Sequence, residues 1–164
     1  MTEVIRLPQP DELSEREKDD AMGAYLMMFA AWAVGLPLPV LNLVAAVIYF
    51  YVNKKSSRFV AFNALQSLLS QVPVTMINIG LVAWLIRALI WSIGFSSAFF
   101  IYLSFMVLIN LLYLIFSIIA LVHARKGRFY YMPFFGRISF SRYYGPNAES
   151  FSKPVPPNRP PEGF

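Results

Sequence analysis

The chain has 164 residues, a length that fits one domain. It is 57% hydrophobic and only 14% charged, whereas a soluble domain carries about a quarter charged residues, and its mean hydropathy is +0.54. These values indicate an integral membrane protein rather than a very apolar soluble helical core. The sequence contains no cysteine, which excludes a disulfide framework, a thiol nucleophile and a cysteine-ligated metal.

The acidic residues are confined to the two ends of the chain. No Asp or Glu lies between residues 21 and 148, whereas nine Lys and Arg residues do. Most enzymes, divalent-metal sites and proton relays depend on carboxylates, so we expect a non-enzymatic protein without a cofactor or a bound metal. The net charge of +5 does not indicate nucleic acid, because the basic residues lie at the ends of apolar segments, as the positive-inside rule requires.

A polar arm, residues 1–14, precedes the first predicted helix. Ser14 and Glu17 have the spacing of a capping box, in which the side chain of each residue binds the backbone amide of the other. We therefore expect a helix to begin at Glu15 and to run through an apolar segment to about residue 35.

The sequence Gly35-Leu-Pro-Leu-Pro39 should break this helix, because its two prolines lack an amide hydrogen. A second apolar segment follows at about residues 40–53. One helix through residues 21–52 would be about 48 Å long, well beyond the ~30 Å hydrocarbon core of a bilayer. We therefore predict a hairpin of two short transmembrane helices. The alternative is a re-entrant or kinked single span, which would place the N-terminus on the opposite side of the membrane.

The third predicted helix, residues 56–92, is long and has an amphipathic start. Pro73 lies inside it and should kink it. The polar residues of this helix recur at spacings of three and four, and so share one face: Asn63, Gln66, Ser67, Ser70, Gln71 and Asn78. Such a face could line a polar cavity or form a docking groove for another helix. It could equally form ordinary hydrogen bonds between helices, or lie in the membrane interface, where water hydrates its amides and hydroxyls.

The fourth predicted helix, about residues 98–124, is the clearest membrane span, because residues 98–122 carry no charge. The aromatic segment Phe129–Phe135 suits the headgroup layer, so residues 125–144 are predicted to be interfacial. Residues 145–164 are rich in proline and should be extended or disordered. This tail could bind an aromatic groove of a partner, or could simply be solvated.

Together these elements predict an all-α integral membrane domain, residues 15–144, with four transmembrane helices. Two basic clusters flank the third and fourth helices: Lys54, Lys55 and Arg58 before them, and Arg125, Lys126, Arg128, Arg137 and Arg142 after them. Because two crossings separate the clusters, both must lie on the same side of the membrane. The positive-inside rule makes that side cytoplasmic. With the hairpin interpretation both termini are cytoplasmic as well. The candidate contacts with lipid headgroups, including anionic ones, are Lys54, Lys55, Arg58, Arg87, Arg125, Lys126 and Arg128. Arg87, near the far end of its helix, either binds a phosphate or anchors that end in the interface.

Two stretches of the sequence resemble the signatures of a known family. The first, Ser57-Arg-Phe-Val-Ala-Phe-Asn-Ala-Leu-Gln66, ends in a glutamine that is nearly invariant there. The second is Ile119-Ala-Leu-Val-His-Ala-Arg-Lys-Gly-Arg-Phe-Tyr-Tyr-Met-Pro133. Over about residues 21–137 the chain resembles the bacterial proteins related to the Tic-twenty subunit of the chloroplast inner-envelope translocon. It departs from that pattern at Asn63, where many relatives carry His, and at Met132, where Tyr is usual.

The resemblance implies an accessory subunit of a protein translocation or insertion complex in the bacterial inner membrane. The residues alone also favour a scaffold that packs against other membrane protein subunits, because the domain has few polar groups, many aromatic residues and long tails. The alternative is a pore or carrier, in which oligomerised helices enclose a path lined by the polar face of the third helix. The sequence contains no glycine-rich phosphate loop, nucleophile elbow or metal-ligand spacing.

Overall fold

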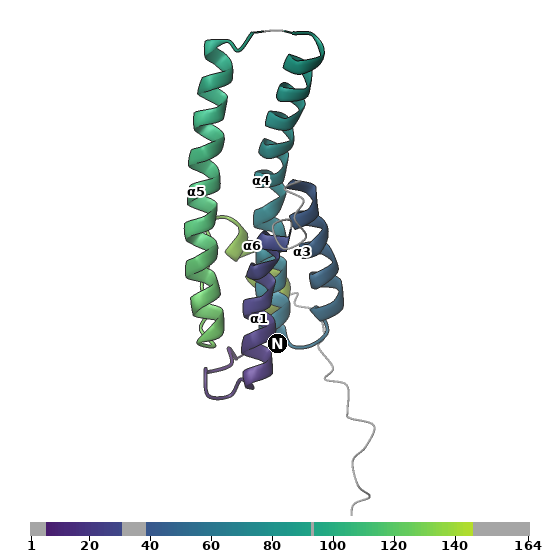
Figure 1. Ribbon diagram of the computed structural model, residues 1–164. Helices are drawn as coiled ribbons and strands as arrows, with labels where there is room; N and C mark the ends of the chain where they lie inside the picture. The colour runs from purple at the N-terminus through teal and green to yellow at the C-terminus, as the bar shows by residue number, and fades with distance from the viewer. Residues whose placement is uncertain (1–5, 31–38, 93, 146–164) are drawn as a thin grey trace, which may run out of the picture.

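A computed structural model describes residues 6–30, 39–92 and 94–145 of the chain (Figure 1). Within that part, five α-helices and one short 3-10 helix make up all the regular structure, and there is no strand. In chain order, the elements are α1 (Glu15–Leu26), η1 (Met27–Phe29), α3 (Pro39–Asn53), α4 (Arg58–Ile90), α5 (Ser97–Arg125) and α6 (Phe135–Tyr144). The all-helical prediction is therefore confirmed for the described residues. The proline-rich tail lies outside them from residue 146 onward.

The first helix begins where the sequence predicts. Ser14 Oγ accepts a hydrogen bond from the amide of Glu17 at 3.2 Å, and Glu17 Oε2 accepts one from the amide of Ser14 at 3.0 Å. This reciprocal pair is the predicted capping box, and it satisfies two amides that the first turn leaves free. The helix tightens into the 3-10 turn η1. Most of the predicted Gly-Pro break lies outside the described residues, which resume at Pro39.

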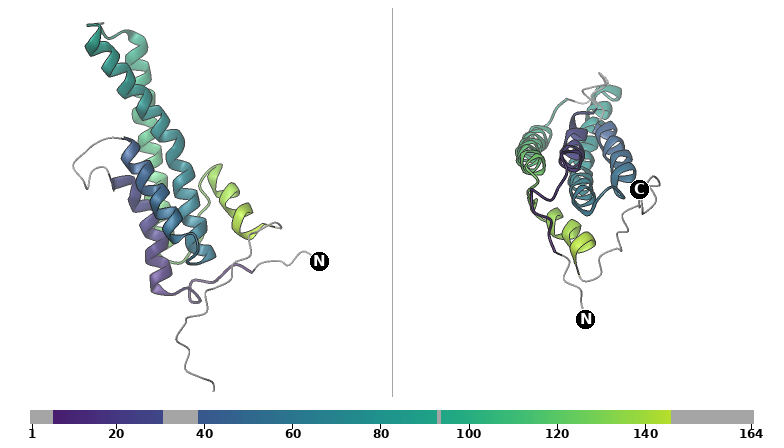
Figure 2. Two further views of the ribbon diagram at one scale, coloured as in Figure 1. Left: turned by 90° about the vertical axis from the view of Figure 1, so that its right-hand side faces the viewer. Right: turned by 90° about the horizontal axis from the view of Figure 1, so that it is seen from below.

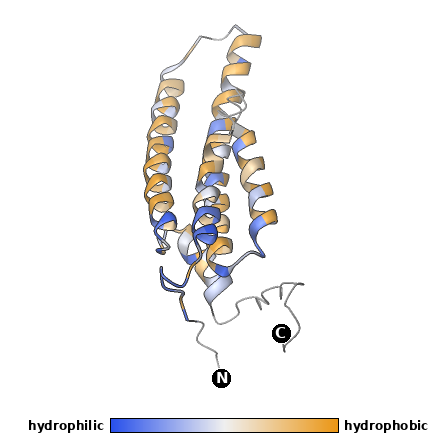
Figure 3. Cartoon of the chain, turned by 60° about the horizontal axis from the view of Figure 1, so that its bottom comes forward, coloured by the Kyte–Doolittle hydropathy of each residue, from blue (hydrophilic) through white to orange (hydrophobic). Residues whose placement is uncertain are grey.

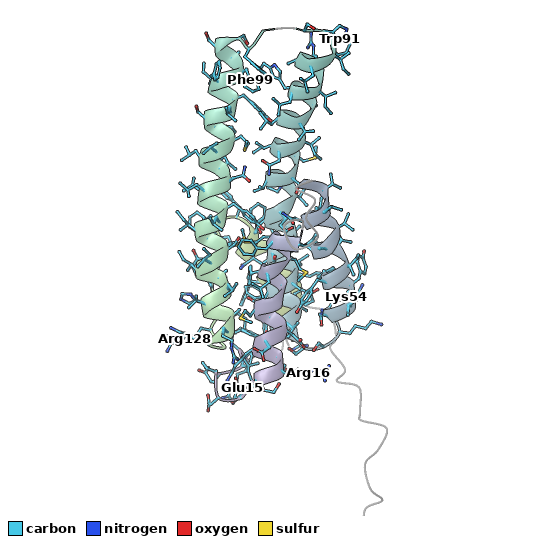
Figure 4. The ribbon with its side chains drawn as sticks, in the orientation of Figure 1. Glu15, Arg16, Lys54, Trp91, Phe99 and Arg128 are labelled. Atoms are coloured by element: carbon cyan, nitrogen blue, oxygen red, sulfur yellow. The ribbon has the colours of Figure 1, made fainter. Side chains whose placement is uncertain are left out.

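The helices α1 and α3 form a hairpin that is much shorter than a membrane is thick. With 15 residues, α3 is about 22 Å long, whereas the hydrocarbon core is about 30 Å thick. Both ends of this hairpin lie at the same end of the molecule, where Figure 4 labels Glu15 and Lys54. Only α4 and α5 are long and apolar enough to cross a membrane among the described helices, so the structure does not support four full spans.

The helices α4 and α5 run antiparallel beside each other over most of their length (Figure 1). With 33 and 29 residues, they are about 50 Å and 44 Å long. The helix α4 continues through Pro73. Their outward surfaces are apolar, and hydrophilic residues gather at the end of the molecule that holds the start of α1 (Figure 3). The pair projects well beyond the shorter helices (Figure 2).

Burial is concentrated at one end, which we call the base. The base consists of α1, η1, α3, α6, the first half of α4 and the second half of α5. Almost every side chain of α4 from Phe59 to Gln71 is buried or half-buried there, whereas α4 has no buried residue beyond Thr75. We call the remaining halves of α4 and α5 the protruding hairpin. Trp91 and Phe99 lie at its tip, far from Glu15 and Arg128 at the base (Figure 4).

The segment after α5 packs against the base. It turns back along the base and ends in α6, a helix that the sequence analysis did not predict. The ring of Phe129 packs against those of Phe59 and Phe62, with centroid distances of 5.1 Å and 5.2 Å. Several aromatic residues of this segment therefore stabilise the base, although Phe134 remains 85% exposed.

Candidate functional site

The polar face of α4 is turned into the protein. All but one of its predicted residues are buried, and the remaining one, Asn78, is half-buried. The buried members are Asn63, Gln66, Ser67, Ser70 and Gln71. Burial of so many polar groups is costly unless each finds a hydrogen-bonding partner, so the partners show what this face does.

Gln66 is the centre of a hydrogen-bond network in the base. Its Nε2 donates to the hydroxyl of Tyr25 at 2.8 Å and to the carbonyl oxygen of Tyr130 at 3.1 Å. Its Oε1 accepts a hydrogen bond from the amide of Met132 at 3.2 Å. The side chain is fully buried, and both of its amide hydrogens are used. One residue therefore joins α1, α4 and the segment that leads to α6.

Two neighbours extend the network along α1. The hydroxyl of Tyr25 donates to Asn63 Oδ1 at 3.0 Å, and Asn63 Nδ2 donates to the carbonyl oxygen of Phe59 at 2.8 Å. One turn further along α4, Ser67 Oγ donates to the carbonyl oxygen of Ala24 at 2.7 Å. The network consists of amides, hydroxyls and backbone groups, which suits the joining of helices rather than proton transfer.

Further along α4, the same polar face lines a cavity of about 450 Å³ between α3, α4 and α5. Its polar lining is Asn42, Gln71, Thr75, Asn78, Asn110 and Tyr113. Asn78 and Asn110 donate to each other's Oδ1 atoms, at 3.1 Å and 2.8 Å. Gln71 Nε2 donates to Ser67 Oγ at 3.4 Å, whereas its Oε1 has no partner among the described residues. The described lining carries no charge, so it does not resemble a site for a hard metal ion.

The predicted headgroup contacts lie at two levels of the molecule. Arg87 is in the last turn of α4, toward the tip of the protruding hairpin. The others are at the base: Lys54, Lys55, Arg58, Arg125, Lys126 and Arg128. Arg125 pairs with two acidic residues of α1, because its Nη1 lies 2.9 Å from Glu15 and 3.2 Å from Asp19. This contact could not be predicted from the sequence, because more than a hundred residues separate the partners.

Acid should loosen the contact between α1 and α5. The hydrogen bond from Lys18, aided by that from Arg125, lowers the pKa of Glu15 below its ordinary value of 4.5. A carboxyl group whose pKa is lowered by folding stabilises the folded state above its unfolded pKa, and this contribution is lost as the pH falls through the folded value. We therefore expect the amides of residues 18–22, the first that bond within the helix, to lose hydrogen-exchange protection several-fold as the pH drops below 4.5.

The matched variant for this measurement is Arg125→Gln. It should lower protection in α1 at neutral pH and reduce the acid dependence in part, because the hydrogen bond from Lys18, the larger cause of the lowered pKa of Glu15, remains. The amides near Gln66 should stay protected in both proteins. Equal protection in the wild type at neutral and acidic pH would show that these ion pairs do not hold α1.

Several network residues were not predicted from sequence. Tyr25 and the backbone groups of residues 130–132 come from segments with no polar pattern, so nothing in their sequence marks them as partners of Gln66. Asn110 did carry a signal, because it is an isolated amide on an apolar helix and such residues usually bond to another helix. Its partner, Asn78, is set by the packing of α4 on α5.

The fold and the site together define a small helical protein with two helices suited to cross a membrane and a buried network that joins its segments. In the part of the chain that the structure describes, no group of His, Cys, Asp or Glu residues could hold a metal ion. The chain belongs to the magnetosome magnetite crystal formation protein family, whose model matches residues 18–139. No curated protein and no solved structure matches the chain.

The sequence was expected to belong with the translocon-related proteins. That assignment was wrong, because the family model that matches is the magnetosome one. The two stretches that carried the resemblance serve the packing of the base. Gln66, from the first, bonds to the backbone of Met132, from the second. Motifs of this kind reflect how helices are joined, and so they do not distinguish a translocon subunit from another small membrane protein. Protein transport is therefore no longer an expectation for this chain.

Proposed function

We propose that this chain is a non-enzymatic protein of the magnetosome membrane that takes part in the formation of magnetite crystals as a scaffold or accessory subunit. The family match carries this proposal, because it extends over residues 18–139 and so includes most of α1, the helices from η1 to α5 and the first half of α6. In this function the partners are the lipid bilayer and other proteins of the same membrane.

The chemistry of the base supports a structural function. The hydrogen-bonding groups of Gln66 and Asn63 are occupied by Tyr25 of α1, by the backbone of residues 130–132 and by the carbonyl oxygen of Phe59. No amide of that pair is therefore directed at a substrate. The described residues between α1 and the C-terminal segment contain no carboxylate that could act as a general base or hold iron. A protein of this kind would act through its position and its contacts.

A carrier or pore is a second candidate function, and the uncharged cavity beside Asn78 and Asn110 favours it. The cavity lies between α3, α4 and α5, and the last two of these helices are long enough to span the bilayer. Two such helices enclose too little space for a continuous path, so this function requires several copies of the chain.

The two candidates differ in what they require of the cavity. In a magnetite-forming host, deletion of the gene should change the number, size or shape of the crystals seen by electron microscopy, and the wild-type gene should restore them.

The double variant Asn78→Leu, Asn110→Leu removes the polar pair and preserves an apolar contact between α4 and α5. A scaffold should still restore the crystals with this variant at equal protein level, whereas a carrier should not. Unchanged crystals after deletion, or absence of the protein from isolated magnetosome membranes, would contradict the proposed function.

A further inference from the structure

The molecule is much wider at one end than at the other. At the base, α1, α3 and α6 surround α4 and α5, whereas the protruding hairpin consists of α4 and α5 alone (Figures 1 and 2). Burial follows the same division, since the buried residues of α4 all lie between Phe59 and Thr75. Because a helix with its side chains is about 10 Å across, five helices occupy roughly two and a half times the area of two.

The surface of the base is suited to lipid. On α3, the apolar residues Val44, Ile48 and Val52 are exposed at a spacing of four, which places them on one face of the helix. On the second half of α5, Ile115, Ile118 and Val122 are also exposed. Charged residues at this end are confined to the outermost turns and connections, except on α6, which exposes Arg137 and Arg142. The long side chains of these two arginines can extend their charged groups toward the headgroups. These faces would be costly in water, and the acyl chains of a bilayer are the environment that covers them.

The base reaches into only part of the bilayer. Its helix α3 is about 22 Å long, which matches the thickness of one leaflet with its headgroup layer, about 20–22 Å. Lys54 and Lys55 lie at the outer end of that helix and Arg128 lies at the outer end of α5, where they can contact the headgroups of the same leaflet. The opposite leaflet is then crossed by the protruding hairpin alone, with Arg87 and Trp91 toward its headgroups.

We propose that this chain is a wedge that recognises membrane curvature. It takes up more area in the leaflet of its basic residues than in the other leaflet, so it fits best where the basic-side leaflet is convex and its lipids are spread apart. If the basic side is cytoplasmic, as the charge distribution predicts, the preferred membrane is a small vesicle inside the cell that exposes its convex face to the cytoplasm. The inference depends on the shape of the chain and not on its proposed function in crystal formation.

The absence of cysteine from the sequence allows a direct test with single thiols. Ser56→Cys places a thiol in the exposed turn at the base, and Ser96→Cys places one in the exposed turn at the tip of the protruding hairpin. Each full-length variant is reconstituted into uncharged phosphatidylcholine vesicles of about 40 nm and about 400 nm diameter, a range over which curvature-sensitive proteins discriminate. A membrane-impermeant maleimide then counts the molecules whose base, or whose tip, faces outward.

The wedge predicts an orientation that depends on vesicle size. The ratio of base-outward to tip-outward molecules should be at least about threefold higher in the small vesicles, because their outer leaflet is convex. The same ratio at both sizes, or a preference for the tip outward, would overturn the proposal. Complete reaction of both thiols would also overturn it, because the chain would then not span the bilayer.

A second pair of sites, Lys55→Cys and Gly94→Cys, repeats the measurement at the same two ends. Residues 55 and 94 are also exposed, so a maleimide can reach them. A result common to both pairs of sites cannot come from a local effect of either serine substitution. Loss of the size dependence here would show that the first result came from the labelling sites. The deletion experiment on crystals is independent of all these outcomes, so the wedge and the proposed function can fail separately.

Discussion

Replacing Gln66 with Met should lower the free energy of unfolding by about 3 kcal/mol, the largest effect that we expect from a single side chain. Methionine fills nearly the same space, so the cost comes from lost hydrogen bonds rather than from a cavity. The hydroxyl of Tyr25, the carbonyl oxygen of Tyr130 and the amide of Met132 would each lose a partner inside the protein. Thermal unfolding in mild detergent, followed by tryptophan fluorescence, would measure the loss.

Gln71→Met is the matched control for this prediction. Gln71 lies on the same face of the same helix and is also buried, but its hydrogen bond to Ser67 Oγ is long, 3.4 Å, and its Oε1 has no described partner. We expect a loss of less than about 1 kcal/mol, because little bonding is removed and an unsatisfied oxygen disappears. Equal losses for the two variants would mean that the network around Gln66 does not hold the base together.

Gly136→Ala should lower the free energy of unfolding by about 2 kcal/mol, although alanine is the better helix former. A Cβ atom at this position would stand 2.7 Å from the Cα of Tyr131 and 3.0 Å from Gln66 Oε1. The first contact is with the backbone and cannot be relieved by a side-chain rotation. The start of α6 would have to move away from α4, which would disturb the bond between Gln66 and Met132 as well. Limited proteolysis should then cleave the segment before α6 faster than in the wild type.

Gly94→Ala provides the comparison. Nothing lies within 4 Å of a Cβ at that position, so the substitution should change stability by less than about 0.5 kcal/mol. If both glycine variants unfolded like the wild type, the close approach of α6 to α4 would not be a constraint on the protein.

The sequence was sufficient to predict the features that arise from local patterns. The capping box at Ser14 starts α1, and the long apolar segments become α4 and α5 within two residues of their expected ends. The polar face of α4 was also identified, because a spacing of three and four residues requires only that the segment be helical. Charge patterning placed Lys54 and Arg128 at one end of the molecule, as the structure has them.

The features that were not predicted depend on contacts between distant segments. The apolar segments at residues 21–34 and 40–52 suggested two spans. The depth of a helix in the membrane is set by what it packs against, and both α1 and α3 stay beside the first half of α4. The helix α6 has little apolar periodicity of its own, and it forms where Phe62 and Gln66 provide a surface for it. The partners of Gln66 could not be found either, since two of them are backbone groups.

The position of Gln66 in the chain has a consequence for how the protein is made. Its partners come 41 residues earlier, at Tyr25, and 66 residues later, at Met132. During synthesis α1 and α4 therefore emerge before residues 130–132, which complete the hydrogen-bond network around Gln66. The side-chain amide of Gln66 lacks its bond to Met132 until α5 has been inserted. Contacts of such long sequence separation form slowly. The final step of folding is then the docking of the C-terminal segment, and a ribosome that stalls before residue 132 would leave a base that is open.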